Sequence, residues 1–366
     1  MKRKLRLGKQ KKVIDKSLLT LTLILTVLGL IAVADASAPQ AMSAFNDKFF
    51  FVKQQLVWAG IGIVLLVIFS KIHYLFWEKV ALPIFIVGII LLILVVIPGL
   101  GSKALGARRW LNLGYFSVQP AEILKFAIAL YFAKLVSKGK GIISFLIPLV
   151  VAAFLVMLQP DLGTTLVIVA IGMTQIFATG FNFFHFIASL LTGLVATVVL
   201  ILTSDYRRER LMTFIEQSKD PLGRSYHIRQ ILFSLGLGGF WGVGLGASRQ
   251  KYLFLPEAAT DSIFAVIAEE LGFVGSFILL ILFALFIFKC LRICLNAPDK
   301  FSQIFSLGLT TWIGAQIFLN IGSMLSVVPL TGVPLPFFSY GGSSLTMILI
   351  ATGILLNISK YESKTG

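Results

Sequence analysis

The chain has 366 residues, of which 57% are hydrophobic and only 13% are charged, and its mean hydropathy is +0.93. This composition excludes a soluble globular protein and is typical of a chain that crosses a membrane many times. The formal net charge of +16 would also suit a nucleic-acid-binding protein, so the positions of the charges have to distinguish the two classes.

Long apolar stretches predict ten membrane-spanning helices. Each contains about 17 to 27 residues, enough to cross about 30 Å of hydrocarbon, with tilt in the longer ones. The expected spans are residues 17–35, 55–71, 80–98, 121–137, 142–158, 164–180, 184–203, 262–288, 304–321 and 341–358. We therefore expect an all-α polytopic membrane protein with a single transmembrane domain, 17–358, between tails at 1–16 and 359–366.

The basic residues predict how this domain is oriented. Eighteen Lys and Arg residues, eight of them in the N-terminal tail, fall on the side of the two termini, whereas the short loops on the other side hold five. The positive-inside rule therefore places both termini in the cytoplasm. The tail is best explained as a topology signal that also contacts anionic lipid, and not as a nucleic-acid-binding arm. The first span is longer than the apolar core of a signal peptide, so we expect an uncleaved anchor.

Segments of unusual composition gather on the outer side. One long outer segment, 204–261, carries apolar residues at helical spacing over 207–218 and 225–235, which predicts two amphipathic helices on the membrane surface. The shorter outer loops contain GARRWLNLGYFSVQPAEILKF, QPDLGTT and PLTGVPLPFFSYGGSS. A protein whose polar segments all face outward is expected to handle a compound at the outer leaflet.

Several side chains near these loops have both a structural and a functional interpretation. Glu122 and Lys125 are three residues apart and share a helix face, either as a structural ion pair or as part of a site. Asp161 either caps the helix that follows it or faces a cavity. Trp110 either lies in the membrane interface or stacks on a sugar.

Arginine side chains directly follow the seventh expected span. Arg207 and Arg210 could grip phosphate oxygens through their guanidinium groups, or anchor the chain in the interface. The Ser343-Ser344 pair has no partner base in the sequence, which argues against a serine nucleophile.

Three acids lie at the start of the eighth expected helix. Asp261 opens this helix on the outer side, where capping is its alternative role. Glu269 and Glu270 lie about 12–14 Å deeper by helix rise, and at least one must face the interior of the bundle. An ion path through a transporter would explain the acids, but not the Arg-, Gly- and Pro-rich loops that accompany them.

At these residues the sequence resembles the SEDS family of bacterial wall synthesis (shape, elongation, division and sporulation). The resemblance extends from about residue 17 to 358. It rests on ARRWLNLGYFSVQPAEILK, QPDLGTT, DPLGRSY, GVGLGASRQKYLFLPEAATDSIFAVIAEELG and PLPFFSYGGSSL. LPEA and SRQK are more similar to the division and sporulation branch, FtsW and SpoVE, than to the elongation branch. The family commonly has His-Thr-Asp-Phe where this chain has Ala259-Thr260-Asp261-Ser262, so the acid is kept.

The resemblance implies a peptidoglycan glycosyltransferase of cell division. It would polymerise lipid II, a disaccharide-pentapeptide on undecaprenyl pyrophosphate, at the outer face of the bacterial cytoplasmic membrane. The family's catalytic acid matches Asp261, which would act as general base on the acceptor 4-hydroxyl in one inverting displacement. The residues considered for substrate contacts are Arg109, Trp110, Glu122, Lys125, Asp161, Arg207, Arg210, Glu257 and Ser343. Glu269 and Glu270 are expected to stabilise helix packing or the cavity.

A divalent cation, Mg²⁺ or Mn²⁺, is a candidate to share the charge of the leaving pyrophosphate. The implied protein partners are a class B penicillin-binding transpeptidase and other membrane proteins of the division complex. Two alternatives stay open. A lipid II flippase or other lipid transporter predicts interior charges that continue to the cytoplasmic half, whereas in this sequence they thin out below Glu270. A non-catalytic scaffold of the division complex needs none of the acids.

Overall fold

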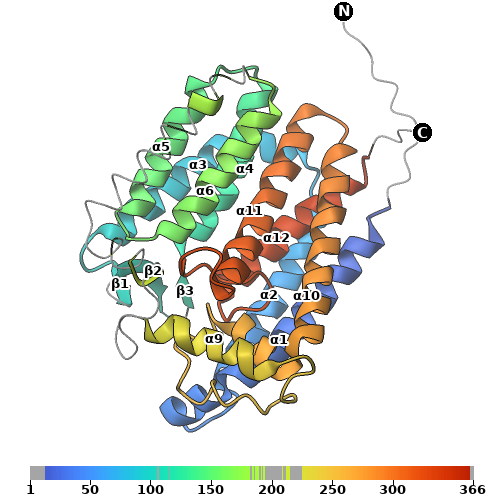
Figure 1. The fold of residues 1–366 in the computed structure, drawn as a ribbon. Coiled ribbons are helices and arrows are strands. Elements are labelled where there is room, and N and C mark those ends of the chain that lie inside the picture. Colours follow the sequence, from blue (N-terminus) through green and yellow to red (C-terminus); the bar gives the residue numbers. More distant parts are fainter. Residues whose placement is uncertain are drawn as a thin grey trace, which may run out of the picture.

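The computed structural model of the protein describes residues 13–104, 107–114, 116–181, 184, 186–188, 191, 193, 208, 212–214 and 225–362. Helices dominate this part of the chain (Figure 1). They are α1 (Lys16–Phe45), α2 (Phe50–Lys71), α3 (Leu75–Val96), α4 (Pro120–Ser137), α5 (Ile143–Met157), α6 (Leu162–Ala178), α9 (Tyr226–Gly238), α10 (Ile263–Leu295), α11 (Lys300–Met324) and α12 (Gly342–Ser359).

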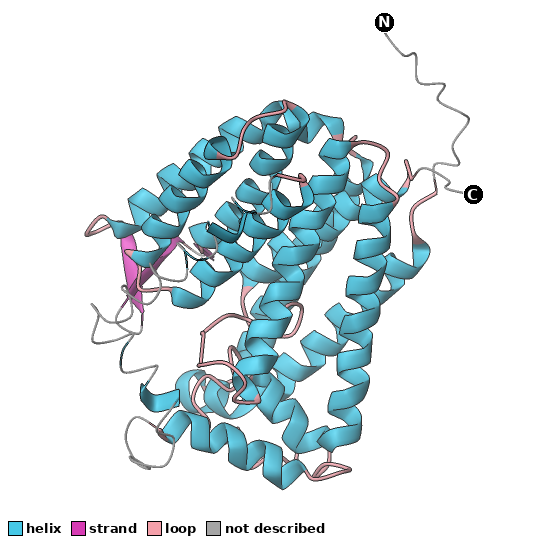
Figure 2. Cartoon of the chain, turned by 45° about the horizontal axis from the view of Figure 1, so that its top comes forward, coloured by secondary structure: helices cyan, strands magenta, loops and turns pink. Residues whose placement is uncertain are grey.

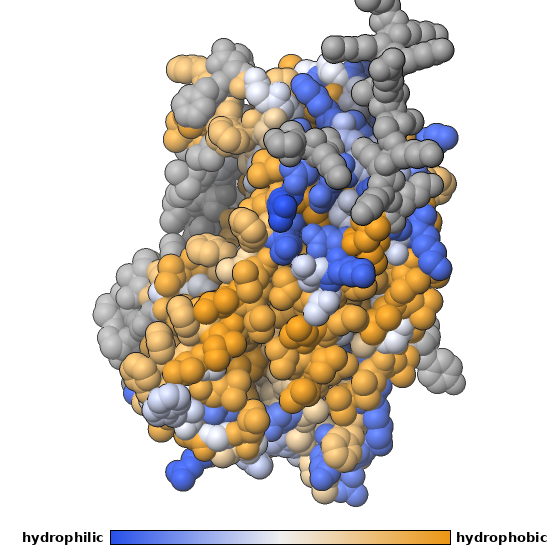
Figure 3. Space-filling view, turned by 90° about the vertical axis from the view of Figure 1, so that its right-hand side faces the viewer, coloured by the Kyte–Doolittle hydropathy of each residue, from blue (hydrophilic) through white to orange (hydrophobic). Residues whose placement is uncertain are grey.

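Six described helices are long and apolar enough to cross a membrane, namely α1, α2, α3, α10, α11 and α12. The protein is therefore a multi-pass membrane protein, as expected from the composition. Helices α5 and α6 are apolar but shorter, and the expected span 184–203 lies largely outside the described residues, so the number of ten spans stays a prediction. Figure 3 shows a broad apolar band across one face of the molecule, with hydrophilic residues gathered toward either end.

A small antiparallel sheet interrupts the helices and was not expected. Its strands β1 (Gly101–Ala104), β2 (Ala107–Leu113) and β3 (Phe116–Val118) pair in the order β1-β2-β3 (Figure 2). The expectation of an all-α fold is thus corrected to a mostly helical fold with one sheet. The strands form because the loop between α3 and α4 must satisfy its own backbone hydrogen bonds once it folds back on itself.

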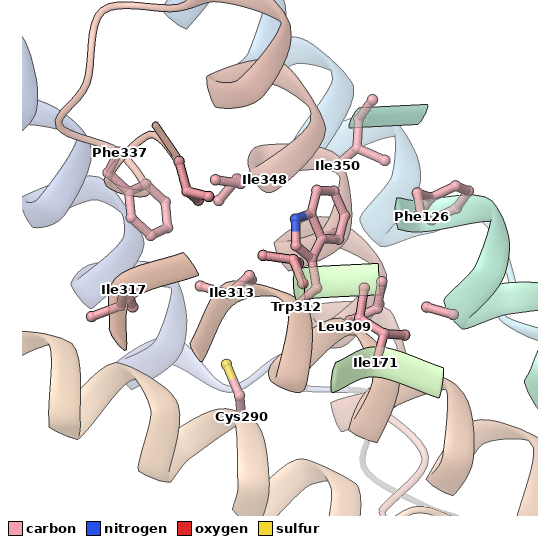
Figure 4. Packing of buried hydrophobic residues seen from close by; sticks show 14 of the residues in the cluster. Phe126, Ile171, Cys290, Leu309, Trp312, Ile313, Ile317, Phe337, Ile348 and Ile350 are labelled. Atoms are coloured by element: carbon pink, nitrogen blue, oxygen red, sulfur yellow. The ribbon is translucent and has the colours of Figure 1, made fainter. Parts of the chain in front are cut away.

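The centre of the bundle is formed by α11, which packs against α4, α6, α10 and α12. Figure 4 shows Trp312 of α11 surrounded by aliphatic and aromatic side chains from its own and neighbouring elements. The two described ends of the chain meet, because the backbone N–H of Asp15 donates to Ser359 Oγ at 3.0 Å. Ends that meet on one side require an even number of membrane crossings. That this side faces the cytoplasm stays a prediction.

Helix α10 is broken near its start. Gly272 has φ 64° and ψ −165°, which separates a short first part from the long remainder. The glycine-rich loop after α9, residues 239–251, fills the break, since Val243 N–H and Gly244 N–H donate at 3.0 Å to the carbonyls of Glu269 and Glu270. A Cβ on Gly242, whose φ is 81°, would lie 2.0 Å from the carbonyl oxygen of Glu270, so this close approach requires glycine. Loop and helix are therefore joined along the backbone.

Candidate active site

Asp261 lies just before α10, in a segment of turns. The residue at the N-cap position is Ser262, and its side chain makes no capping hydrogen bond. The expected alternative role of Asp261 as a helix cap is therefore not what the structure has. Its side chain is half-buried, which leaves part of it accessible from outside the protein.

The backbone around Asp261 is held by three consecutive carbonyl groups. Ala259 O accepts from the N–H of Tyr340 at 2.8 Å, and Thr260 O accepts from Ser339 Oγ at 2.6 Å. The third carbonyl, of Asp261 itself, accepts from Nδ2 of Asn320 at 2.8 Å. The segment before α10 is thereby fixed to α11 and to the loop 325–341 between α11 and α12.

The two departures from the family motif are both buried. Ala259 is packed in the core, and Ser262 is fully buried, with its Oγ 2.8 Å from Nε2 of His227 in α9. A histidine of α9 thus contacts the acid-bearing segment from another element. The sequence contains no signal for this contact, because His227 and Ser262 are 35 positions apart.

A second group of predicted residues lies where β2 meets the turn before α6. Arg109 donates from Nε to the carbonyl of Gln159 at 3.2 Å and from Nη2 to the carbonyl of Pro160, and its Nε is 3.7 Å from Asp161 Oδ2. Asp161 caps α6 by accepting from the N–H and the hydroxyl of Thr164, both at 2.9 Å. The capping role is thus present, and Arg109 anchors the sheet to this turn. Trp110, the next residue of β2, is half-buried.

The loop 325–341 joins these two groups. A Cβ on Gly163, in the first turn of α6, would lie 2.4 Å from the carbonyl oxygen of Thr331, so α6 packs directly on this loop. Ser343 at the start of α12 donates to the carbonyl of Ser117 at 3.2 Å and accepts from the N–H of Gln119 at 3.3 Å. The sheet, the start of α6, the loop 325–341 and the Asp261 segment are therefore one continuous structure, on the side of the molecule away from the described chain ends (Figure 1).

Glu122 and Lys125 form an ion pair inside the bundle. Lys125 Nζ is 2.6 Å from Glu122 Oε1, each side chain is 1% exposed, and Nζ is 5.5 Å from the ring centroid of Trp312. Both residues belong to α4, and the ammonium of Lys125 also contacts α11 through Trp312. This geometry suits a structural ion pair. That the pair is part of a functional site stays the alternative prediction.

Glu269 and Glu270 are both buried and both bind the glycine-rich loop. Glu269 accepts from Ser248 Oγ at 2.6 Å and from the N–H of Arg249 at 2.9 Å. Glu270 accepts from the N–H of Ser248 at 3.2 Å and from Lys251 Nζ at 2.7 Å. These partners come from the loop, and through Lys251 they also connect α10 to Asp35 of α1.

The other candidates are less informative. Arg207 and Arg210 lie outside the described residues, as does most of the expected helix 207–218. Helix α9 (Tyr226–Gly238) confirms the helix that was expected at 225–235. Glu257 is exposed, and its carboxylate accepts from Thr260 Oγ1 at 2.6 Å. Within the described residues, no three His, Cys, Asp or Glu side chains gather as metal ligands would.

Comparison with known proteins identifies relatives over nearly the whole chain. Residues 15–364 match the FtsW, RodA and SpoVE family, described as cell cycle protein. Stage V sporulation protein E of Bacillus subtilis is 42% identical over 356 residues, which cover 95% of this chain and 97% of that protein. A probable peptidoglycan glycosyltransferase FtsW of Trichlorobacter lovleyi is 36% identical, covering 94% and 93% of the two chains.

Solved structures agree with this relationship. A chain from a study of the structural coordination of polymerization and crosslinking by a peptidoglycan synthase complex superposes with a TM-score of 0.78 at 29% identity, covering 94% of this chain and 97% of that one. The rod shape determining protein RodA of Thermus thermophilus superposes with a TM-score of 0.72 at 25% identity, covering 96% and 98%.

Proposed function

The chain belongs to the FtsW, RodA and SpoVE family of cell cycle proteins, and from that premise we propose that it is a peptidoglycan glycosyltransferase that polymerises lipid II at the outer face of the bacterial cytoplasmic membrane. Relatives named as probable peptidoglycan glycosyltransferases support the activity. The likeness to a chain of a peptidoglycan synthase complex supports a role in strand polymerisation. The similarity to a sporulation protein and to FtsW proteins supports the division and sporulation branch.

The observation that carries the proposal is the fixed position of Asp261. Three consecutive carbonyls around it are hydrogen-bonded to α11 and to the loop 325–341, while its own side chain stays half-buried. A general base has to be within hydrogen-bond distance of the proton that it accepts, and a rigid backbone supplies that placement before the substrate arrives.

In the proposed reaction Asp261 accepts the proton of the acceptor 4-hydroxyl. The hydroxyl oxygen then bonds to the anomeric carbon of the donor sugar as the bond to pyrophosphate breaks. The donor linkage is α and the product linkage is β, so one in-line displacement inverts the carbon. The leaving pyrophosphate gains negative charge and requires cationic neighbours, for which Arg207 and Arg210 are the candidates because the guanidinium of Arg109 is engaged with the turn before α6.

A divalent cation, Mg²⁺ or Mn²⁺, would neutralise charge on the pyrophosphate. The described residues lack a cluster of three or more side chains able to hold such an ion. A cation there would have to rely on the substrate's own phosphates and few protein ligands, as Mg²⁺ often does.

We also propose a class B penicillin-binding transpeptidase and other membrane proteins of the division complex as partners, supported by the likeness to a complex that couples polymerization and crosslinking. The transporter and scaffold alternatives have less support. A transporter needs ionisable groups that line a path, but Glu269 and Glu270 bind an outer loop and Glu122 and Lys125 bind each other. A non-catalytic scaffold would not require the backbone around Asp261 to be fixed by three hydrogen bonds.

The test is polymerisation of labelled lipid II by the purified protein with its cognate transpeptidase. We expect long glycan strands from the wild type, none from Asp261→Asn and strands from Asp47→Asn, which changes an acid between α1 and α2, outside the candidate site. Both variants should keep the wild-type melting temperature and partner binding. Full activity of Asp261→Asn would remove Asp261 from the mechanism. An inactive wild type, with partner and Mg²⁺ or Mn²⁺ present, would favour the transporter or scaffold function.

A further inference from the structure

The segment that carries Asp261 is held at two places. One is the set of three carbonyl hydrogen bonds at residues 259–261. The other lies ten residues earlier at Lys251, whose Nζ donates to Asp35 Oδ1 of α1 and to Glu270 Oε1 of α10, both at 2.7 Å. We refer to Asp35, Lys251 and Glu270 as the ionic anchor.

The ionic anchor is a buried contact between three separate elements. The side chains of Lys251 and Glu270 are 3% and 5% exposed, and that of Asp35 is 28% exposed. Burial by itself would lower the pKa of Lys251, but its hydrogen bonds to Asp35 and Glu270 outweigh that effect, so the pKa lies above its ordinary value. Lys251 is therefore charged at every physiological pH and attaches the loop to both helices.

The chain between the two attachments is strained. Leu253 has φ 68° and Glu257 has φ 52°, in the left-handed region that non-glycine residues seldom adopt. Both side chains are exposed, so their own packing does not compensate for the unfavourable backbone. Such conformations persist only where the surrounding structure imposes them. Here the fixed ends at Lys251 and at 259–261, together with the buried side chain of Leu255 between them, impose these conformations.

We propose that Lys251 is a positioning residue for Asp261: the ionic anchor holds the start of the strained segment 252–258, and thereby sets where the segment delivers the catalytic carboxylate. This inference rests on the proposed function. Without the anchor, the residues at 253 and 257 can return to ordinary φ values, and the end of the segment shifts. A displacement of about 1 Å at a reacting group can lower a rate about 100-fold.

The experiment compares Lys251→Met, Lys251→Arg and Asp35→Ala with the wild type. Asp35→Ala removes only the partly exposed acid and leaves the Lys251–Glu270 pair, so it tests the attachment to α1 if Lys251→Met does not fold. The matched control is Lys53→Met, which breaks an exposed ion pair of the same 2.7 Å length with Asp47. The readouts are kcat and KM for lipid II polymerisation, and hydrogen exchange of residues 248–261.

We expect Lys251→Met to lower kcat about 10- to 100-fold with KM changed less than about twofold, and Asp35→Ala to lower kcat about 10-fold or less. Both should speed hydrogen exchange in 248–261. Lys251→Arg should restore most of kcat because it keeps the cation, and Lys53→Met should match the wild type. Wild-type kcat and exchange in both Asp35→Ala and Lys251→Met would overturn the proposal. If the wild type does not polymerise, the proposed function fails, while hydrogen exchange still decides whether the anchor fixes the segment.

Discussion

Replacing Lys125 with methionine removes the cation from an ion pair inside the bundle. Its Nζ is 2.6 Å from Glu122 Oε1, and each side chain is 1% exposed. The second oxygen, Oε2, of Glu122 has no hydrogen-bond partner among the described residues. The variant therefore leaves a carboxylate in an apolar interior with nothing to balance its charge. Breaking a buried pair in this way costs about 3–5 kcal/mol, and we expect the free energy of unfolding to fall by that amount.

The assay is reversible unfolding in detergent micelles, applied to a double-mutant cycle. The double variant Glu122→Gln with Lys125→Met removes both charges and keeps the side-chain volumes. It should recover most of the lost stability, because replacing a whole buried pair is often close to neutral. Lys53→Met serves as the control, since its ion pair with Asp47 has a similar length but is exposed. It should unfold like the wild type.

Two results would refute this reasoning. If Lys125→Met lowers the free energy of unfolding by less than about 1 kcal/mol, water or another group reaches Glu122. That result would fit a functional site open to solvent and not a sealed structural ion pair. A double variant no more stable than Lys125→Met would show that the methionine, and not the uncompensated charge, causes the loss.

Two further predictions concern packing and pH. Gly163→Ala should lower both the melting temperature and the polymerisation rate, because the added Cβ would lie 2.4 Å from the carbonyl oxygen of Thr331. The control Gly60→Ala, whose Cβ would have nothing within 4 Å, should be neutral or slightly stabilising. Equal changes in melting temperature for the two variants would contradict this. Burial, together with the hydrogen bond that it donates to Asp299, raises the pKa of Tyr74. The folded protein then keeps a proton that the unfolded chain releases, so stability should be unchanged up to about pH 10 and fall above it. Alkaline unfolding of Tyr74→Phe should lack this part of the decline, and an identical pH dependence would refute it.

The positions of the membrane helices could be predicted closely. The expected span 341–358 agrees with α12 (Gly342–Ser359) within one residue at each end, and the expected span 55–71 ends at the same residue as α2 (Phe50–Lys71). In hydrocarbon a backbone has to satisfy its hydrogen bonds internally, so an apolar stretch of sufficient length becomes a helix whatever its neighbours are. The ends of other helices were less certain. Helix α1 continues to Phe45, ten residues beyond the expected end of its span, because a helix can extend past the apolar stretch that predicts it.

The sheet between α3 and α4 was missed for a related reason. Its strands are three to seven residues long, and a short strand is stable only when its partners are in place. The one sequence signal was the alternation in RWLNL, followed by a turn at Gly114 with φ 73°. That pattern was outweighed by the apolar helices on either side.

The sequence by itself determined the membrane class, the helical segments and the stretches where polar chemistry gathers, because these depend on local composition and on the solvent. Only the tertiary structure decided which groups meet there. Asn320 reaches the carbonyl of Asp261 across 59 positions, and Lys251 reaches Asp35 across 216. Such contacts depend on how the helices pack and on which buried charges then need a partner. The acid that carries the proposed chemistry could therefore be named from the sequence, but the contacts that hold it in position could not.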